Sequence, residues 1–214
     1  FLSDDNVIDL PKLVQQLILR CFILPFRPAQ AKEAYEQIWT KEGSPLILNT
    51  QKIADALAHK TGWNVKIAMR YQFPSIKQAI EDFKNENIDE IEVISLYPQH
   101  AMSTTLSTAL EVKRVVNKYY PELKLNFVEP FYDHPDYIKA LSESIKPHLK
   151  KFDKLIFSYH GIPMRHIKKS DVIGSHCEGS KSCCSSDNEA AHKCYRSNCY
   201  HTSKLTANYL NLNS

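Results

Sequence analysis

The sequence predicts an α/β protein with a Rossmann-like parallel sheet and helices on both faces. Short apolar segments alternate along the chain with amphipathic segments of helical period, and glycine or proline separates one from the next. Strands that alternate with helices in this way form a parallel sheet with right-handed crossovers. With 43% hydrophobic and 24% charged residues, the chain has the composition of a globular protein that can bury a core.

The elements can be placed in order from their periodicity and their breakers. Residues 50–60 form an amphipathic helix that stops at Gly62, and residues 65–71 follow as a strand. Pro74 opens the next helix, whose apolar positions have helical spacing. The remaining elements are expected to be a strand over 91–97, a helix over 103–119, a strand over 125–128, a helix over 136–149, a strand over 152–159 and a helix over 195–210. We expect a first α/β domain over residues 1–150 and the start of a similar one over 151–214.

Three of the expected strands end in polar or aromatic residues that could line a cleft. These ends carry Arg70 with Tyr71, Tyr97 to His100, and Tyr159 with His160. His160 follows an apolar run and precedes Gly161, which places an imidazole at a strand tip, where open α/β sheets bind ligands. No glycine-rich phosphate loop follows any strand, which disfavours a nucleotide. The net charge of +3 is scattered, and this distribution speaks against nucleic acid.

The sequence contains no segment that is long and apolar enough to cross a membrane. Its most apolar stretch, residues 13–26, is too short and is interrupted by Gln15, Gln16 and Arg20. Two interpretations stay open: a buried helix, with Cys21 packed in the core, or a pocket lip that touches membrane lipid. We therefore expect a cytoplasmic protein, with peripheral membrane contact as the second interpretation.

Taken together, the short motifs resemble those of the ferrochelatases, which insert ferrous iron into a porphyrin to make haem. Each motif is weak by itself, but they occur in the family's order over nearly the whole chain. The similar segments are Phe1–Asp4 with Ile8–Pro11, Tyr35, Gly43–Pro45, Met69–Tyr71, Tyr97–His100 with Ser103–Thr105, and Ser158–Pro163.

The resemblance implies a role for six residues. His160 corresponds to the family's active-site histidine, which acts as the proton acceptor for pyrrole N–H groups or as a ligand of the iron. His100 lies where the family has a residue near the path of the metal. The positions that line the porphyrin pocket or bind its propionates are Arg27, Tyr35, Ser44 and Arg70.

The chemistry of metal insertion agrees with these residue types. Insertion removes two pyrrole protons, and an imidazole with a pKa near 6.5 can accept one at cellular pH. Arginine binds the carboxylates at the rim of the ring bidentately and without changing its own protonation. Each residue also has a purely structural interpretation: a hydrogen-bonded histidine, a packed tyrosine, a turn serine, or an arginine that faces water.

Five of the six cysteines lie between residues 177 and 199, with the pattern C-x5-C-C-x9-C-x4-C. The rest of the chain is too poor in cysteine for a disulfide-rich scaffold, so the cluster indicates a metal or iron–sulfur site. The resemblance implies that residues 172–194 are an insertion, and some ferrochelatases carry a [2Fe–2S] cluster on such cysteines. A cluster takes four thiolates. We expect these to be Cys177, Cys184, Cys194 and Cys199, with Cys183 as the alternative to Cys184.

Two other occupants of the cysteine cluster stay open. Zinc also takes four thiolates, and His176 or His192 could replace one of them. Disulfides are the third interpretation.

The resemblance also implies that a catalytic group is missing from these 214 residues. The family's first strand is not found, nor is most of a second α/β half with a glutamate that faces the histidine, so we expect the chain alone to be inactive. Two other functions stay open: a chelatase for another tetrapyrrole or another metal such as cobalt, and a non-catalytic iron–sulfur or porphyrin-binding module. Protoporphyrin IX and coproporphyrin III are both candidate substrates, and the oligomeric state is open.

Overall fold

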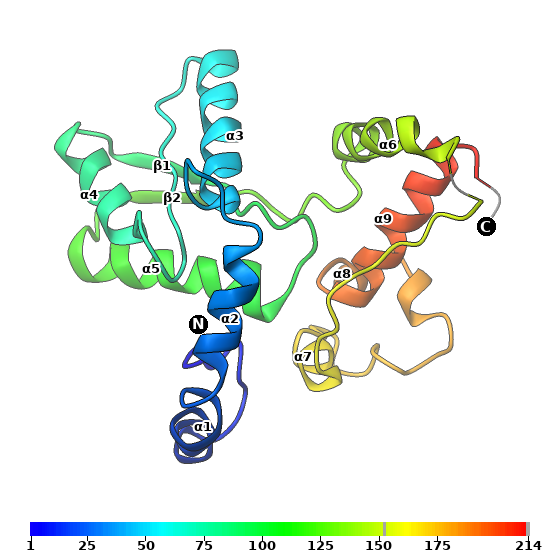
Figure 1. Cartoon of the computed structure of the whole chain (residues 1–214), viewed down its shortest axis with the longest axis horizontal. Helices are drawn as coiled ribbons and strands as arrows, with labels where there is room; N and C mark the ends of the chain where they lie inside the picture. Colours follow the sequence, from blue (N-terminus) through cyan, green and yellow to red (C-terminus); the bar gives the residue numbers. More distant parts are fainter. Residues whose placement is uncertain (152, 213–214) are drawn as a thin grey trace. The chain divides into compact units, whose positions relative to one another are not determined.

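The structure, a computed structural model, describes residues 1–151 and 153–212, without the side chains of residues 29 and 30. It divides into two compact units, Phe1–Ile91 with Leu110–Leu125, and Glu92–Ala109 with Asn126–Ser214. The elements along the chain (Figure 1) are α1 (Lys12–Ile18), η1 (Leu19–Ile23), α2 (Arg27–Glu36), α3 (Pro45–Thr61), α4 (Ile76–Asn85), β1 (Glu90–Val93), η2 (Met102–Leu106), α5 (Ser107–Tyr119), β2 (Lys124–Phe127), α6 (Pro135–Leu149), α7 (Met164–Lys169), η3 (Cys183–Ser185), α8 (Glu189–His192) and α9 (Tyr195–Tyr209).

A small parallel sheet confirms the α/β class. Strands β1 and β2 run side by side, and α5 forms the crossover between them (Figure 1). The Lys124 amide donates to the Asp89 carbonyl at 2.9 Å, and the Val128 amide donates to the Val93 carbonyl at 3.0 Å. These slanted bonds, four residues apart on both strands, are those of a parallel ladder.

The strands expected over 65–71 and 152–159 do not form. Met69 makes an isolated bridge to Ser75, and residues 154–163 have no regular structure; residue 152 lies outside the described residues. A strand exists only where a neighbour accepts its backbone hydrogen bonds, and among the described residues β1 and β2 pair only with each other. The apolar run before His160 predicts extended chain but cannot supply that neighbour.

Two expected helices of the first unit form but start elsewhere than expected: α3 begins at Pro45 and not at residue 50, and α4 begins at Ile76 and not at Pro74. Helix α3 starts with Pro45 after an extended Ser44 and ends at Gly62, whose φ of 73° is the left-handed conformation of a C-terminal cap. Ser75 caps α4, since its side chain accepts a hydrogen bond from the Gln78 amide at 3.1 Å. The apolar face of α4 is buried, as its spacing predicts.

The second unit is organised around α9, which packs against α6 and α8. The inner face of α9 is polar, an unusual feature for a core helix. Its fully buried polar side chains are Ser197, Asn198, Thr202 and Thr206. Buried polar groups are costly unless they are hydrogen-bonded, and three of these four, Ser197, Asn198 and Thr202, bond segments that carry candidate site residues.

The apolar stretch at residues 13–26 forms α1 and η1, and most of its large side chains are exposed, although Leu19 is buried. Leu13 is 87% exposed and Phe22 is 68% exposed, and Cys21 is also exposed. The buried-helix interpretation and the core position of Cys21 are therefore wrong. No helix among the described residues combines the length and the apolar character that a membrane span requires.

Candidate functional site

Two of the expected substrate residues share one face of α2. Arg27 is the first residue of this helix, and Tyr35 lies two turns later. Both line an open depression of about 400 Å³, whose other walls are Ala31, Ala34 and Ile38. Tyr35 is 59% exposed, so the structure gives its ring no place in the core of this unit. The depression combines an aromatic ring, small apolar side chains and one cation.

Ser44 lies immediately before α3 and is half-buried. Its carbonyl accepts a hydrogen bond from the Leu48 amide at 3.0 Å, which begins the helix. Its hydroxyl makes no capping bond to the helix. The structure therefore gives Ser44 the turn position that its sequence context also allowed.

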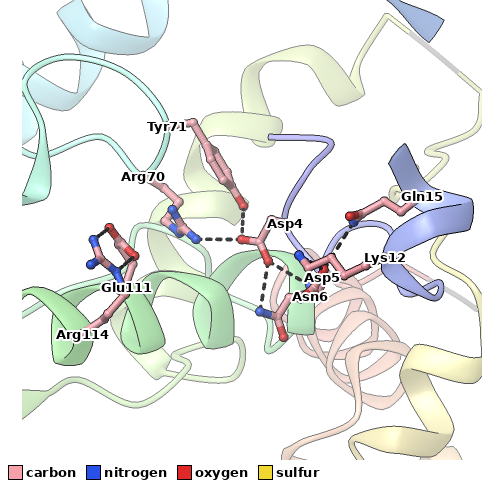
Figure 2. Close-up of polar contacts among 9 residues, drawn as sticks. All are labelled: Asp4, Asp5, Asn6, Lys12, Gln15, Arg70, Tyr71, Glu111 and Arg114. Carbon is pink, nitrogen blue, oxygen red and sulfur yellow. Dashed lines mark hydrogen bonds and ion pairs between the residues drawn. The ribbon is translucent and has the colours of Figure 1, made fainter. Parts of the chain in front are cut away.

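Arg70 is held by a carboxylate from the start of the chain (Figure 2). Its Nη2 lies 2.7 Å from Asp4 Oδ2, and the Tyr71 hydroxyl donates to the same oxygen at 2.8 Å. The guanidinium also lies over the Tyr71 ring, 4.5 Å from its centre. The ring of Phe1 packs edge-on against Tyr71 at 5.2 Å. Asp4 lies in one of the family-like segments, but its role was not foreseen because 66 residues separate it from Arg70.

His100 is half-buried in the loop before η2. Its Nδ1 lies 3.3 Å from Thr105 Oγ1, and its backbone amide donates to Asn198 Oδ1 at 2.9 Å. Burial lowers the pKa of His100 below its usual 6.5, and the positive charge of Lys193 acts in the same direction. The imidazole is therefore neutral at cellular pH, as a metal ligand or proton acceptor must be.

His160 lies on an exposed segment and not at the tip of a buried strand, which corrects the expected setting. Side chains of α9 nevertheless form hydrogen bonds with this segment. The Tyr159 hydroxyl lies 2.9 Å from Ser203 Oγ. The Tyr195 hydroxyl, also on α9, makes a hydrogen bond with the backbone of His160. Burial raises the pKa of Tyr195 to about 12, while this hydrogen bond lowers it.

The structure thus brings both candidate histidine segments onto one helix, α9. Asn198 holds the His100 segment, and Tyr195 and Ser203 hold the residues at 159 and 160. The sequence reasoning missed Asn198. The available signal was the polar series at positions 198, 202 and 206, which recurs every fourth residue on the face that an ordinary helix fills with apolar side chains.

Four of the five clustered cysteines line one small cavity of about 20 Å³ in the insert. They are Cys177, Cys183, Cys184 and Cys194. Cys199, which was expected to be a ligand, is buried on α9 and is not among the residues that line this cavity. Cys183 Sγ and Cys184 Sγ lie 3.9 Å apart, and all six cysteines are free thiols. Within residues 1–151 and 153–212, no three His, Cys, Asp or Glu side chains converge on a point that could hold a metal.

Three of the five clustered cysteines have a raised pKa, which favours the thiol form. Burial raises the pKa of Cys177, and it raises the pKa values of Cys184 and Cys199 to about 11. A thiolate, not a thiol, binds a metal, so metal binding here must release protons. The Asp171 carboxylate fixes the start of the insert, accepting bonds from the His176 and Cys177 amides at 2.8 Å. Thiols are the donor type that a cluster or zinc would take, but among the described residues these four do not converge on one point.

The chain is similar in sequence to ferrochelatases. The family model described as ferrochelatase matches residues 1–214. The ferrochelatase of Stutzerimonas stutzeri is 39% identical over 207 residues, which are 95% of this chain and 60% of that protein. The ferrochelatase of Azotobacter vinelandii is 39% identical over 215 residues, 99% of this chain and 63% of that protein. The chain therefore spans about 60% of the length of the curated relatives it matches.

Proposed function

This chain belongs to the ferrochelatase family, and on that premise we propose that the protein containing it inserts ferrous iron into a porphyrin in haem biosynthesis. The observation that carries the proposal is the family match over residues 1–214, which includes every candidate substrate residue. Such an enzyme is a lyase of the porphyrin metal chelatase type. Its substrates are ferrous iron and protoporphyrin IX or coproporphyrin III.

We assign the proton transfer to His160. Metal insertion removes two pyrrole protons, and the exposed imidazole of His160 is open to a ligand on a segment that α9 holds in place. His100 supports this step as a neutral imidazole near the path of the iron, because burial keeps its pKa low. A general acid or base contributes ~10²- to 10⁴-fold to a rate, so loss of His160 should cost that much.

We assign porphyrin binding to residues of the first unit. The depression that Arg27 and Tyr35 share offers an aromatic ring and a cation, the pair that an apolar dicarboxylate needs. Arg70 is assigned to a propionate, with Asp4 holding its guanidinium. Ser44 is assigned to the rim of the same pocket.

We also propose that the chain comprises a first domain over residues 1–150 and the start of a second domain at residue 151.

The exposed apolar side chains of α1 and η1 support peripheral membrane contact. Leu13, Leu17 and Phe22 are each more than half exposed. Porphyrins are poorly soluble in water, and such a surface would let the enzyme exchange them with lipid. We propose a cytoplasmic enzyme that touches the membrane through this surface. Binding to anionic vesicles that is lost in Leu13→Asp would support this contact.

We further propose that the insert holds a [2Fe–2S] cluster, with zinc as its rival. Cys177, Cys184 and Cys194 line one cavity and would supply three thiolates. The fourth is Cys199, the expected ligand, or Cys183, which lines the cavity. A bound cluster would supply one-electron redox chemistry. The test is the visible absorption spectrum of the purified protein. An iron–sulfur absorption band that is lost in Cys194→Ser would support the cluster. A colourless protein that contains zinc would contradict it.

The proposed function is tested with the purified full-length protein. It should consume ferrous iron and porphyrin and form haem, followed by the change in the porphyrin absorption spectrum. His160→Ala should bind porphyrin with little change but lose ~10²-fold or more in kcat. Porphyrin that stays metal-free in the wild-type reaction would refute the proposal.

A further inference from the structure

We propose that Asn198 is a positioning residue that fixes His100 to the cysteine-rich insert. The proposal rests on the proposed function, because it needs His100 to lie near the path of the iron. It adds that the insert and the iron site share one buried hydrogen-bonded group. The contacts of Asn198 itself carry the argument.

The side chain of Asn198 bonds two separate segments at once. Its Oδ1 accepts the backbone N–H of His100 at 2.9 Å. Its Nδ2 donates to the Ala191 carbonyl at 3.2 Å and to the His192 carbonyl at 3.1 Å. These two carbonyls end α8, directly before Cys194, a candidate metal ligand.

The partners allow only one orientation of this amide. The His100 N–H needs an acceptor, and the two carbonyls need donors, so the oxygen must face His100 and the nitrogen must face α8. Asn198 is fully buried, which leaves no water to replace a lost bond. A buried group without its partner carries a large desolvation cost. The His100 segment and the end of α8 are therefore held in register with each other.

Neighbouring residues make the link stiff. Thr202, one turn further on α9, accepts from Gln99 Nε2 at 3.2 Å and donates to the Tyr132 carbonyl at 2.8 Å. Thr105 accepts from the Ala101 amide at 3.1 Å. Residues 99–101 are thus held on both sides of His100. A shift at the end of α8 would reach the His100 imidazole through Asn198.

The test compares three variants of the full-length protein. Asn198→Ala removes the link, and Asn198→Gln keeps its donors and acceptor one methylene further out. Thr206→Ala is the control: Thr206 lies on the same helix and is equally buried, and its hydroxyl has no hydrogen-bond partner among the described residues. The readouts are kcat, the KM values for iron and porphyrin, and hydrogen exchange of segments 99–101 and 189–193.

We expect Asn198→Ala to lower kcat by ~10- to 100-fold with little change in porphyrin KM, the cost of a small misplacement at a reacting centre. Hydrogen exchange should accelerate in both segments, and Asn198→Gln should recover part of the kcat. Thr206→Ala should keep the wild-type kcat. An unchanged kcat in Asn198→Ala, or an equal loss in Thr206→Ala, would overturn the proposal.

Two further outcomes separate the proposal from its premise. A wild-type protein without metal insertion would refute the proposed function, while hydrogen exchange would still decide whether Asn198 links the two segments. If Asn198→Ala does not fold, hydrogen exchange of the wild-type protein tests the link instead. Its His100 amide should exchange as slowly as the amides of α9, and exchange at the rate of an unbonded amide would overturn the link.

Discussion

The ion pair between Asp4 and Arg70 offers a sharp test of how the start of the chain is attached. Asp4 Oδ2 accepts from both Arg70 Nη2 and the Tyr71 hydroxyl, at 2.7 and 2.8 Å. Asp4→Asn keeps the shape of this side chain but removes its charge. The neighbouring residue supplies a matched control, because Asp5 pairs with Lys12 at the same distance of 2.7 Å but on the surface.

The magnitude follows from the exposure of the two pairs. The Asp4 and Arg70 side chains are 8% and 21% exposed, whereas those of Asp5 and Lys12 are 60% and 65% exposed. Breaking a fully buried pair costs ~3–5 kcal/mol, and an exposed pair contributes ~0–1 kcal/mol. Asp4→Asn keeps a neutral acceptor in a partly buried site, so we expect a loss of ~1–2 kcal/mol. Asp5→Asn should stay within ~0.5 kcal/mol.

Hydrogen exchange at the Met69 amide measures this loss locally. That amide donates to the Pro74 carbonyl at 2.7 Å, next to Arg70. A loss of one to two kcal/mol corresponds to a ~5- to 30-fold faster exchange in the full-length protein. Asp5→Asn should leave the rate nearly unchanged. Equal rates in the two variants would show that the Asp4 carboxylate does not hold this segment.

Three further predictions concern the second unit. Burial lowers the pKa of His100 below 6.5, so the unfolded chain binds this proton before the folded chain as the pH falls. The free energy of unfolding should therefore decrease below pH 6.5. An equally steep decrease in the unfolding free energy of a His100→Gln variant would contradict the assignment. The buried Tyr132 hydroxyl lies 2.7 Å from His192 Nδ1, so Tyr132→Phe should cost ~1 kcal/mol in chemical denaturation, against less than ~0.5 kcal/mol for the exposed Tyr209→Phe; the reverse order would be inconsistent with this contact. The metal content of Cys183→Ser and Cys199→Ser, measured by elemental analysis, should differ. The cysteine whose replacement leaves the metal content unchanged is not a ligand.

The sequence predicted the helices better than the strands. Helices α3 and α4 were foreseen from their apolar spacing, and the end of α3 from Gly62, whereas their starts after Ser44 and Ser75 were not foreseen. A strand depends on a partner that can lie anywhere in the chain, so the apolar run before His160 predicted extended chain and no more. The exposure of α1 and η1 was likewise not predictable, because the apolar composition of a segment does not show whether another part of the protein covers it.

The candidate site was predicted as a list of residues and not as a set of contacts. The motifs named His100 and His160, but nothing in the sequence showed that α9 holds both segments. The roles of Asp4 and Asn198 were missed for one physical reason: each side chain bonds a residue far away in the chain, at separations of 66 and 98 residues. Among the cysteines, Cys199 was expected to be a ligand, whereas the cavity is lined by Cys183.

Iron insertion by the full-length protein and its His160→Ala variant tests the central proposal most directly. Porphyrin and ferrous iron are mixed anaerobically with each protein, and haem formation is followed by absorbance. We predict haem formation by the wild-type protein and a ~10²-fold or greater loss of kcat in His160→Ala, with porphyrin still bound. A variant that forms haem at the wild-type rate would contradict the role assigned to His160.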